Sequence, residues 1–88
     1  GNMAIKMNKT IKCITQDWYI KIFNSKGMNK GNTIQTYGYF TNATEAQNHE
    51  NAVEMNSFNF TAIADKDIFE QGYEYLKTTE EFEGAIDC

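Results

Sequence analysis

The sequence predicts an α+β fold: a small antiparallel β-sheet of three to four strands in a meander, with one C-terminal α-helix packed on a face. Several stretches between residues 10 and 62 alternate apolar and polar side chains with the two-residue period of a strand. Segments rich in glycine and asparagine separate these stretches, as turns do. Residues 65–77 instead place their apolar side chains at helical spacing.

Length and composition indicate one domain, at residues 10–88. Eighty-eight residues, 41% of them hydrophobic and 14% aromatic, suffice for one modest core and argue against disorder throughout. Residues 1–9 are polar and unpatterned, so we expect a flexible N-terminal segment, with a loosely paired arm as the alternative. Its first residues have the character of an expression-tag remnant, with Met3 or Met7 as the natural start.

The first strong strand is predicted at residues 18–24, where Ile20 and Ile22 share one phase with the tryptophan and form the core face. Residues 10–15 form either a separate short strand or the beginning of this one. In both cases a bulge or turn is expected at residues 16–17.

A polar loop at residues 24–32 is predicted to join this strand to the next as a hairpin. It lacks the Gly-Lys-Ser/Thr ending and the following helix of a phosphate-binding loop. Its exposed side chains Lys26, Met28 and Lys30 are candidates for contact with a protein partner, with a mobile hairpin tip as the alternative.

Residues 33–41 form the second strong predicted strand, in which Tyr37 and Tyr39 share a face. Three readings of this face are open: contact with solvent, cover by a second layer, or an oligomer interface. Two aromatic side chains on an outer face favour the interface, so these tyrosines are a further candidate contact site. Gly38 predicts either a β-bulge or a close approach of Gly72 in the helix.

The third strong strand is predicted at residues 52–62, where the apolar side chains change phase. Either a bulge at residues 56–57 or burial on different faces at the two ends is expected. Asp67 is the predicted N-cap of the helix, and Lys77 suits the negative end of its dipole. We expect the helix to pack Ile68, Phe69, Tyr73 and Leu76 against Trp18, Ile20, Phe40, Phe58 and Phe60.

The residue inventory argues against an enzyme and predicts no catalytic residue, metal site or cofactor. The chain has one histidine, His49, two distant cysteines, Cys13 and Cys88, and no arginine. These leave few groups for acid–base or nucleophilic chemistry and no spacing for a tetrahedral zinc site. Arginine makes the commonest bidentate base contacts, so direct nucleic-acid binding is not expected. No apolar run approaches the roughly twenty residues of a membrane span, and no signal-peptide pattern is present, which predicts a cytoplasmic protein.

Charge is unevenly distributed along the chain. The first forty residues carry six lysines and one aspartate, a formal charge of +5, and the rest carry two lysines against eleven carboxylates, a charge of −9. Together these give the net charge of −4. Complementary halves favour self-association into a homo-oligomer. Interleaving of the two sets on folding would instead leave an evenly charged surface.

The ending of the chain carries a family resemblance. Residues 70–78 read EQGYEYLKT and residues 81–88 read EFEGAIDC. Together they resemble the "QAYEYLKTLPEFAGAVDC"-like ending of small, mostly uncharacterised proteins encoded by tailed bacteriophages and prophages, with departures at Gly72 and at Thr79-Glu80. The resemblance implies a non-enzymatic tail, virion or assembly protein, in the host bacterial cytoplasm or the virion. Its implied partners are further copies of itself or other phage structural proteins, and it brings no catalytic residues.

An alternative function follows from the acidic balance of the chain. A small acidic phage protein can inhibit a host defence nuclease by mimicking DNA, with carboxylates in place of phosphates. This reading requires a spaced row on the surface, formed by Glu70, Glu74, Glu80, Glu81 and Glu83.

Overall fold

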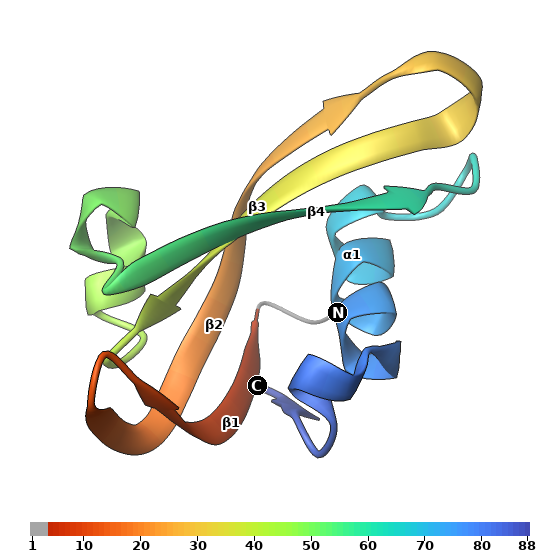
Figure 1. Cartoon of the computed structure of the whole chain (residues 1–88). Helices are drawn as coiled ribbons and strands as arrows, with labels where there is room; N and C mark the ends of the chain where they lie inside the picture. The colour runs from red at the N-terminus through yellow and green to blue at the C-terminus, as the bar shows by residue number, and fades with distance from the viewer. Residues whose placement is uncertain (1–3) are drawn as a thin grey trace.

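The computed structural model describes residues 4–88, which form one five-stranded antiparallel sheet and one α-helix near the C-terminal end (Figure 1). The sheet order is β4-β3-β2-β1-β5, so four consecutive strands make a meander and β5 adds beside β1. The α+β prediction is confirmed, but the strand count is five rather than three to four. The elements are β1 (Ile5–Ile11), β2 (Ile14–Gly27), η1 (Asn29–Gly31), β3 (Asn32–Phe40), η2 (Glu45–Gln47), η3 (His49–Asn51), β4 (Glu54–Thr61), α1 (Ile68–Thr78), η4 (Glu80–Phe82) and β5 (Ile86–Asp87).

β1 and β2 form a hairpin whose two-residue turn uses Lys12 (φ 49°) and Cys13 (φ 69°). Positive φ at both central residues is the geometry of a type I′ turn, whose twist suits the strands it joins. The prediction of a flexible segment is therefore wrong for residues 5–9, and residues 16–17 lie inside a strand rather than in a turn. The alternation of apolar and polar residues in β1 is hard to recognise in the sequence because Lys9, a charged residue, lies on the side of the strand that faces the core. The rest of the predicted segment, residues 1–3, lies outside the described residues.

A β-bulge interrupts the ladder between β2 and β3. The register shifts between Ile22 and Asn24, which leaves Phe23 as the extra residue. The ladder between β3 and β4 is regular along its whole length. The bulges predicted at Gly38 and at residues 56–57 are therefore wrong. The apolar phase changes in β4 because Met55 lies on the exposed outer face of the sheet.

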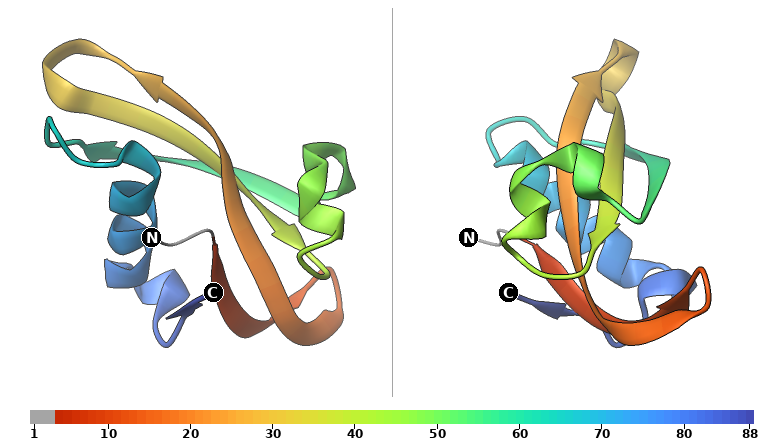
Figure 2. Two further views of the ribbon diagram at one scale, coloured as in Figure 1. Left: turned by 180° about the vertical axis from the view of Figure 1, so that it is seen from behind. Right: turned by 90° about the vertical axis from the view of Figure 1, so that its left-hand side faces the viewer.

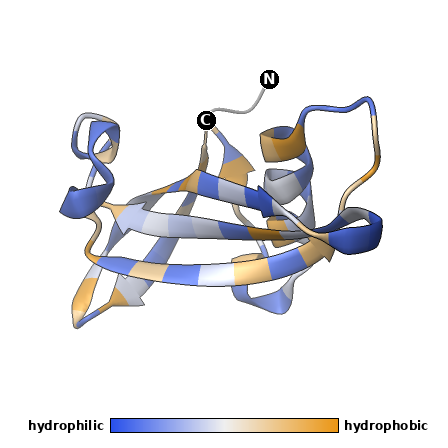
Figure 3. Ribbon diagram, turned by 90° about the horizontal axis from the view of Figure 1, so that it is seen from above, coloured by the Kyte–Doolittle hydropathy of each residue, from blue (hydrophilic) through white to orange (hydrophobic). Residues whose placement is uncertain are grey.

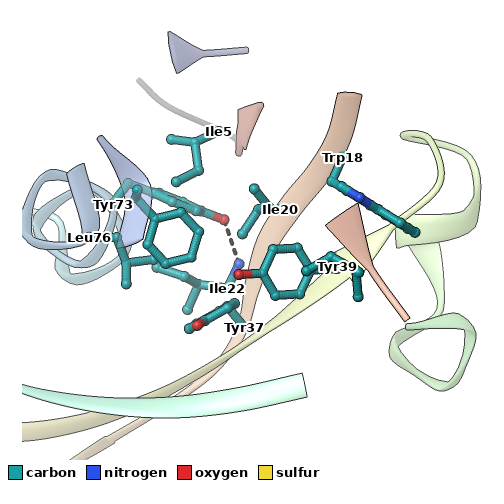
Figure 4. Close-up of a cluster of buried hydrophobic side chains, with 10 residues drawn as sticks. Ile5, Trp18, Ile20, Ile22, Tyr37, Tyr39, Tyr73 and Leu76 are labelled. Atoms are coloured by element: carbon teal, nitrogen blue, oxygen red, sulfur yellow. Dashed lines mark hydrogen bonds between the residues drawn. The ribbon is translucent and has the colours of Figure 1, made fainter. Parts of the chain in front are cut away.

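The helix covers one face of the sheet, and the main core lies between the two (Figure 4). Hydrophobic and hydrophilic residues alternate along the strands accordingly (Figure 3). Phe40 is absent from this core because the odd-numbered residues of β3 face the helix, and Phe69 is 38% exposed, so both predicted contacts are wrong. The buried members of the core are Ile5, Ile11, Trp18, Ile20, Ile22, Tyr37, Tyr39, Tyr73, Leu76 and Phe82.

The short helical turns η2 and η3 lie at the end of the molecule away from α1 (Figure 2). Phe23 stacks there on His49, with ring centroids 5.2 Å apart. A Cβ on Gly38 would press on Ala52 of this connection. Gly38 thus makes room for the η3–β4 segment, and its predicted approach to Gly72 is wrong.

The helix sits unusually close to β3. Asp67 is the N-cap, as predicted, and its carboxylate accepts a 2.9 Å hydrogen bond from the Glu70 N–H. One turn later Gly72 faces the fully buried side chain of Gln35, whose Nε2 donates to the Ile68 carbonyl at 3.1 Å. A side chain at position 72 would collide with the Gln35 amide, so glycine is what allows this approach.

Candidate functional site: the groove between β4 and α1

The C-terminal end of β4 lies beside α1 (Figure 1). The surface between them is hollowed. The hollow has a volume of about 870 Å³ and is open to solvent. We call it the acidic groove. Its lining residues are Phe60, Thr61, Ile63, Lys66, Asp67, Glu70, Gln71, Glu74 and Tyr75.

Three aromatic rings form the apolar wall beside this groove. Phe58 and Phe60 lie two residues apart on β4 and so share a face, with centroids 5.9 Å apart. Tyr75 of α1 stacks on both, with centroid distances of 5.7 Å and a tilt of only 4° to Phe58. Tyr75 remains 39% exposed. An exposed aromatic face of this kind can receive an apolar side chain or a cation.

The groove carries negative charge. Three carboxylates line it, those of Asp67, Glu70 and Glu74, against the single ammonium of Lys66, a formal charge of −2. Asp67 is the N-cap of α1 and Glu70 lies in its first turn, where carboxylates are favoured by the positive end of the helix. Glu74 also forms a 3.0 Å ion pair with Lys77. The groove therefore suits a positively charged partner group.

The strand beside the groove is an open edge of the sheet. β4 pairs with β3 on one side, and in the described residues no strand pairs with its other side. Its sequence, EMNSFNFT, contains no proline or lysine, and its ladder has no bulge. Sheet edges without these protections offer unpaired backbone groups to another chain.

A second hollow, of about 430 Å³, lies on the other side of the Tyr75 ring. Beside it, Lys9 Nζ lies 3.0 Å from Tyr39 Oη and 3.4 Å from a Glu81 carboxylate oxygen. Tyr39 donates to the same oxygen at 3.2 Å. Burial raises the pKa of Tyr39, and the neighbouring Tyr37 and Glu81 raise it further. The tyrosine stays neutral, and the cluster ties β1 and β3 to η4.

The predicted surface pair of tyrosines is contradicted by burial. Tyr37 is 3% exposed and Tyr39 is fully buried, and their rings meet edge to face at 5.6 Å in the main core. Periodicity places them on one face correctly, but it does not tell which face the helix covers. Neither ring is available to a partner.

The other predicted contact residues do lie on the surface, at the tip of the β2–β3 hairpin. Lys26, Met28 and Lys30 are exposed, Met28 by 52%. In residues 4–88 the ion pairs involve Lys9 and Lys77, so the charges of Lys26 and Lys30 are uncompensated within the described chain. Their role in contact remains a prediction.

Within residues 4–88, the remaining chemistry-bearing residues form no further site. Cys13 and Cys88 are exposed free thiols, and burial raises the pKa of Cys88. Among the described residues, no group of three or more His, Cys, Asp or Glu side chains is placed to hold a metal ion. No helix in residues 4–88 is long and apolar enough to cross a membrane.

The contact of the helix with Phe58 and Phe60 is predicted from sequence and confirmed, but the part of Tyr75 in this aromatic wall is missed, although a signal for it exists. Tyr75 falls outside the apolar stripe of the helix, which runs through Gly72, Tyr73 and Leu76. A large aromatic residue off the buried stripe, beside the acidic face, indicates a side chain with another partner.

Comparisons of the chain with protein-family models, with curated proteins and with solved structures found no match.

Proposed function

We propose that this protein acts without catalysis, through protein–protein contacts, as a tail, virion-associated or assembly protein of a bacteriophage or prophage. The phage assignment is supported by the resemblance of residues 70–88 to the ending of such proteins. The observation that carries the contact role is the acidic groove beside the open edge of β4. The protein would work in the host cytoplasm or in the assembled particle.

The groove combines the two features that protein-binding sites on sheets use. Unpaired backbone groups of β4 can hydrogen-bond an incoming chain, and neighbouring side-chain sites give selectivity. Half-exposed aromatic rings such as Tyr75 supply apolar contact at low entropic cost, since they are already held by stacking.

The alternative, a DNA-mimic inhibitor, finds less support in the arrangement of charge. Of the five carboxylates it requires, Glu81 pairs with Lys9 at 3.4 Å and Glu74 pairs with Lys77 at 3.0 Å. A lysine that pairs with a carboxylate offsets its negative charge, so these carboxylates imitate a row of DNA phosphates less well.

The phage role is tested by affinity capture from bacteria in which the encoding phage is multiplying, with bound proteins identified by mass spectrometry. Virion or tail proteins should be retained by the wild type and lost with Tyr75→Ala. Met55→Ala, an exposed apolar residue on the other face of β4, is the matched control and should retain them. Recovery of a host nuclease in their place would overturn the proposal in favour of the inhibitor.

A further inference from the structure

The hairpin tip and the acidic groove have opposite charge and complementary surfaces. Lys26, Met28 and Lys30, which we call the basic tip, place two ammonium groups around an exposed thioether. The groove offers a net negative charge beside the face of Tyr75. Lysine pairs with carboxylates and stacks on aromatic rings, and methionine sulfur contacts aromatic rings favourably.

The tip is a defined structure rather than a loose loop. The N–H of Met28 donates to the Asn32 carbonyl at 2.6 Å, which closes the turn. Lys30 adopts a left-handed conformation with φ of 60°. A tip fixed by the backbone loses less conformational entropy on binding than a mobile one.

Tip and groove border each other on the same molecule. The Ala62 N–H donates to the Gly31 carbonyl at 2.9 Å, and Asn32 pairs with Thr61 at the end of β4. When two complementary patches are adjacent, a two-fold axis between two copies brings each patch onto its counterpart. Both contacts then form at once and the assembly closes.

We propose that the basic tip of one copy occupies the acidic groove of a second copy, and that the exchange is reciprocal in a two-fold dimer. This inference rests on the proposed function, since it names the first partner of the contact site. Lys26 and Lys30 face Glu70 and Glu74 of the second copy, and Met28 packs on its Tyr75. The contact covers the exposed face of Tyr75 and compensates the charges of Lys26, Lys30 and Glu70, which no ion pair compensates within residues 4–88 of one copy. Glu74, which already pairs with Lys77, gains a second cation.

The test exchanges the two charges. One variant carries Lys26→Glu and Lys30→Glu, and the other carries Glu70→Lys and Glu74→Lys. Solution mass is measured by light scattering for each variant alone and for an equimolar mixture, after circular dichroism has verified folding. The matched controls exchange charge at exposed sites elsewhere and are Lys6→Glu with Lys12→Glu, and Glu45→Lys with Glu50→Lys.

We expect the wild type and both controls to have twice the 10.1 kDa mass of the chain, and each variant alone to be monomeric. The mixture should return to the dimer mass, because every tip then meets a groove of opposite charge. The wild-type dimer should weaken at least tenfold between about 0.1 M and about 1 M salt, since exposed ion pairs are screened.

Four results would overturn the inference: a monomeric wild type, a dimer indifferent to salt, a mixture that stays monomeric, or a mass above that of a dimer. The wild-type salt series needs no variant, so the inference stays testable if a variant fails to fold. None of these results decides the phage role, which the capture experiment tests separately. A phage protein that adds a strand to β4 would support that role even without a dimer.

Discussion

The backbone N–H of Ile22 donates a 2.8 Å hydrogen bond to the phenolic oxygen of Tyr73 (Figure 4). Ile22 precedes the bulge at Phe23, where the ladder between β2 and β3 is interrupted. A buried N–H beside such an interruption needs an acceptor, and the helix provides it. Tyr73 therefore joins helix to sheet by a polar contact inside an apolar core.

Replacing Tyr73 with phenylalanine should lower the free energy of unfolding by about 1–3 kcal/mol, because the Ile22 N–H is left buried without this acceptor. Urea denaturation measures the change. Tyr75→Phe is the control, because the Tyr75 ring is half-exposed and stacking needs only the ring. Equal stability of Tyr73→Phe and Tyr75→Phe would show that the bond to Ile22 contributes nothing.

Alkaline pH should destabilise the fold through the same residue. Burial raises the pKa of Tyr73 to about 12, although the bond from Ile22 opposes the shift. An unfolded tyrosine ionises near pH 10, so up to pH 10 this residue's contribution to stability is constant. Between pH 10 and 12 the unfolded state loses the proton first, and the free energy of unfolding falls by up to about 1.4 kcal/mol per pH unit. Denaturation midpoints across this range should fall less steeply in Tyr73→Phe than in the wild type.

The helix and its cap are predictable from sequence because their signals are local. Asp67, Glu70 and the apolar stripe lie within three turns of one another. The bulge at Phe23 is not predictable, since it depends on which residues of β3 lie opposite. β1 is missed for a related reason: Lys9 points toward aromatic rings, 4.9 Å from the Phe82 centroid, where a pattern requires an apolar residue.

Gly72→Ala should destabilise the protein although alanine favours helices by about 1 kcal/mol over glycine. The added methyl group collides with the amide of Gln35, which is held by bonds to Ser25 Oγ at 3.0 Å and to the Ile68 carbonyl. We expect a net loss of about 1–3 kcal/mol. Adding Gln35→Ala should recover part of that loss in a double-mutant cycle. A stabilised Gly72→Ala variant would contradict the close approach of helix and strand.

Tyr39→Ala should unfold the protein more readily by about 3–5 kcal/mol, because the ring is fully buried against Phe82 and Trp18. Chemical denaturation is the measurement. Tyr75→Ala, which removes a ring at the surface, should cost less than half as much. A Tyr39→Ala variant of nearly wild-type stability would contradict the burial of this ring in the main core.

One part of the candidate site is predictable from sequence and the other is not, as for the fold. Lys26, Met28 and Lys30 are recognised from the loop composition, which specifies exposure directly. The groove is assembled from the end of β4 and the outer side of α1, whose contact depends on how the helix lies across the sheet. The spacing of residues in the sequence does not predict the angle between the helix and the strands.

The central claim is that the acidic groove and the basic tip are one contact surface. The most direct test follows backbone amide NMR shifts of the wild type on dilution from about 1 mM to about 10 μM, a range that spans weak self-association. The account predicts concentration-dependent shifts at residues 26–31 and 60–75, with none at the Lys12-Cys13 turn. Unchanged spectra from a protein that tumbles as a monomer, or shifts confined to the β1–β5 edge, would contradict it.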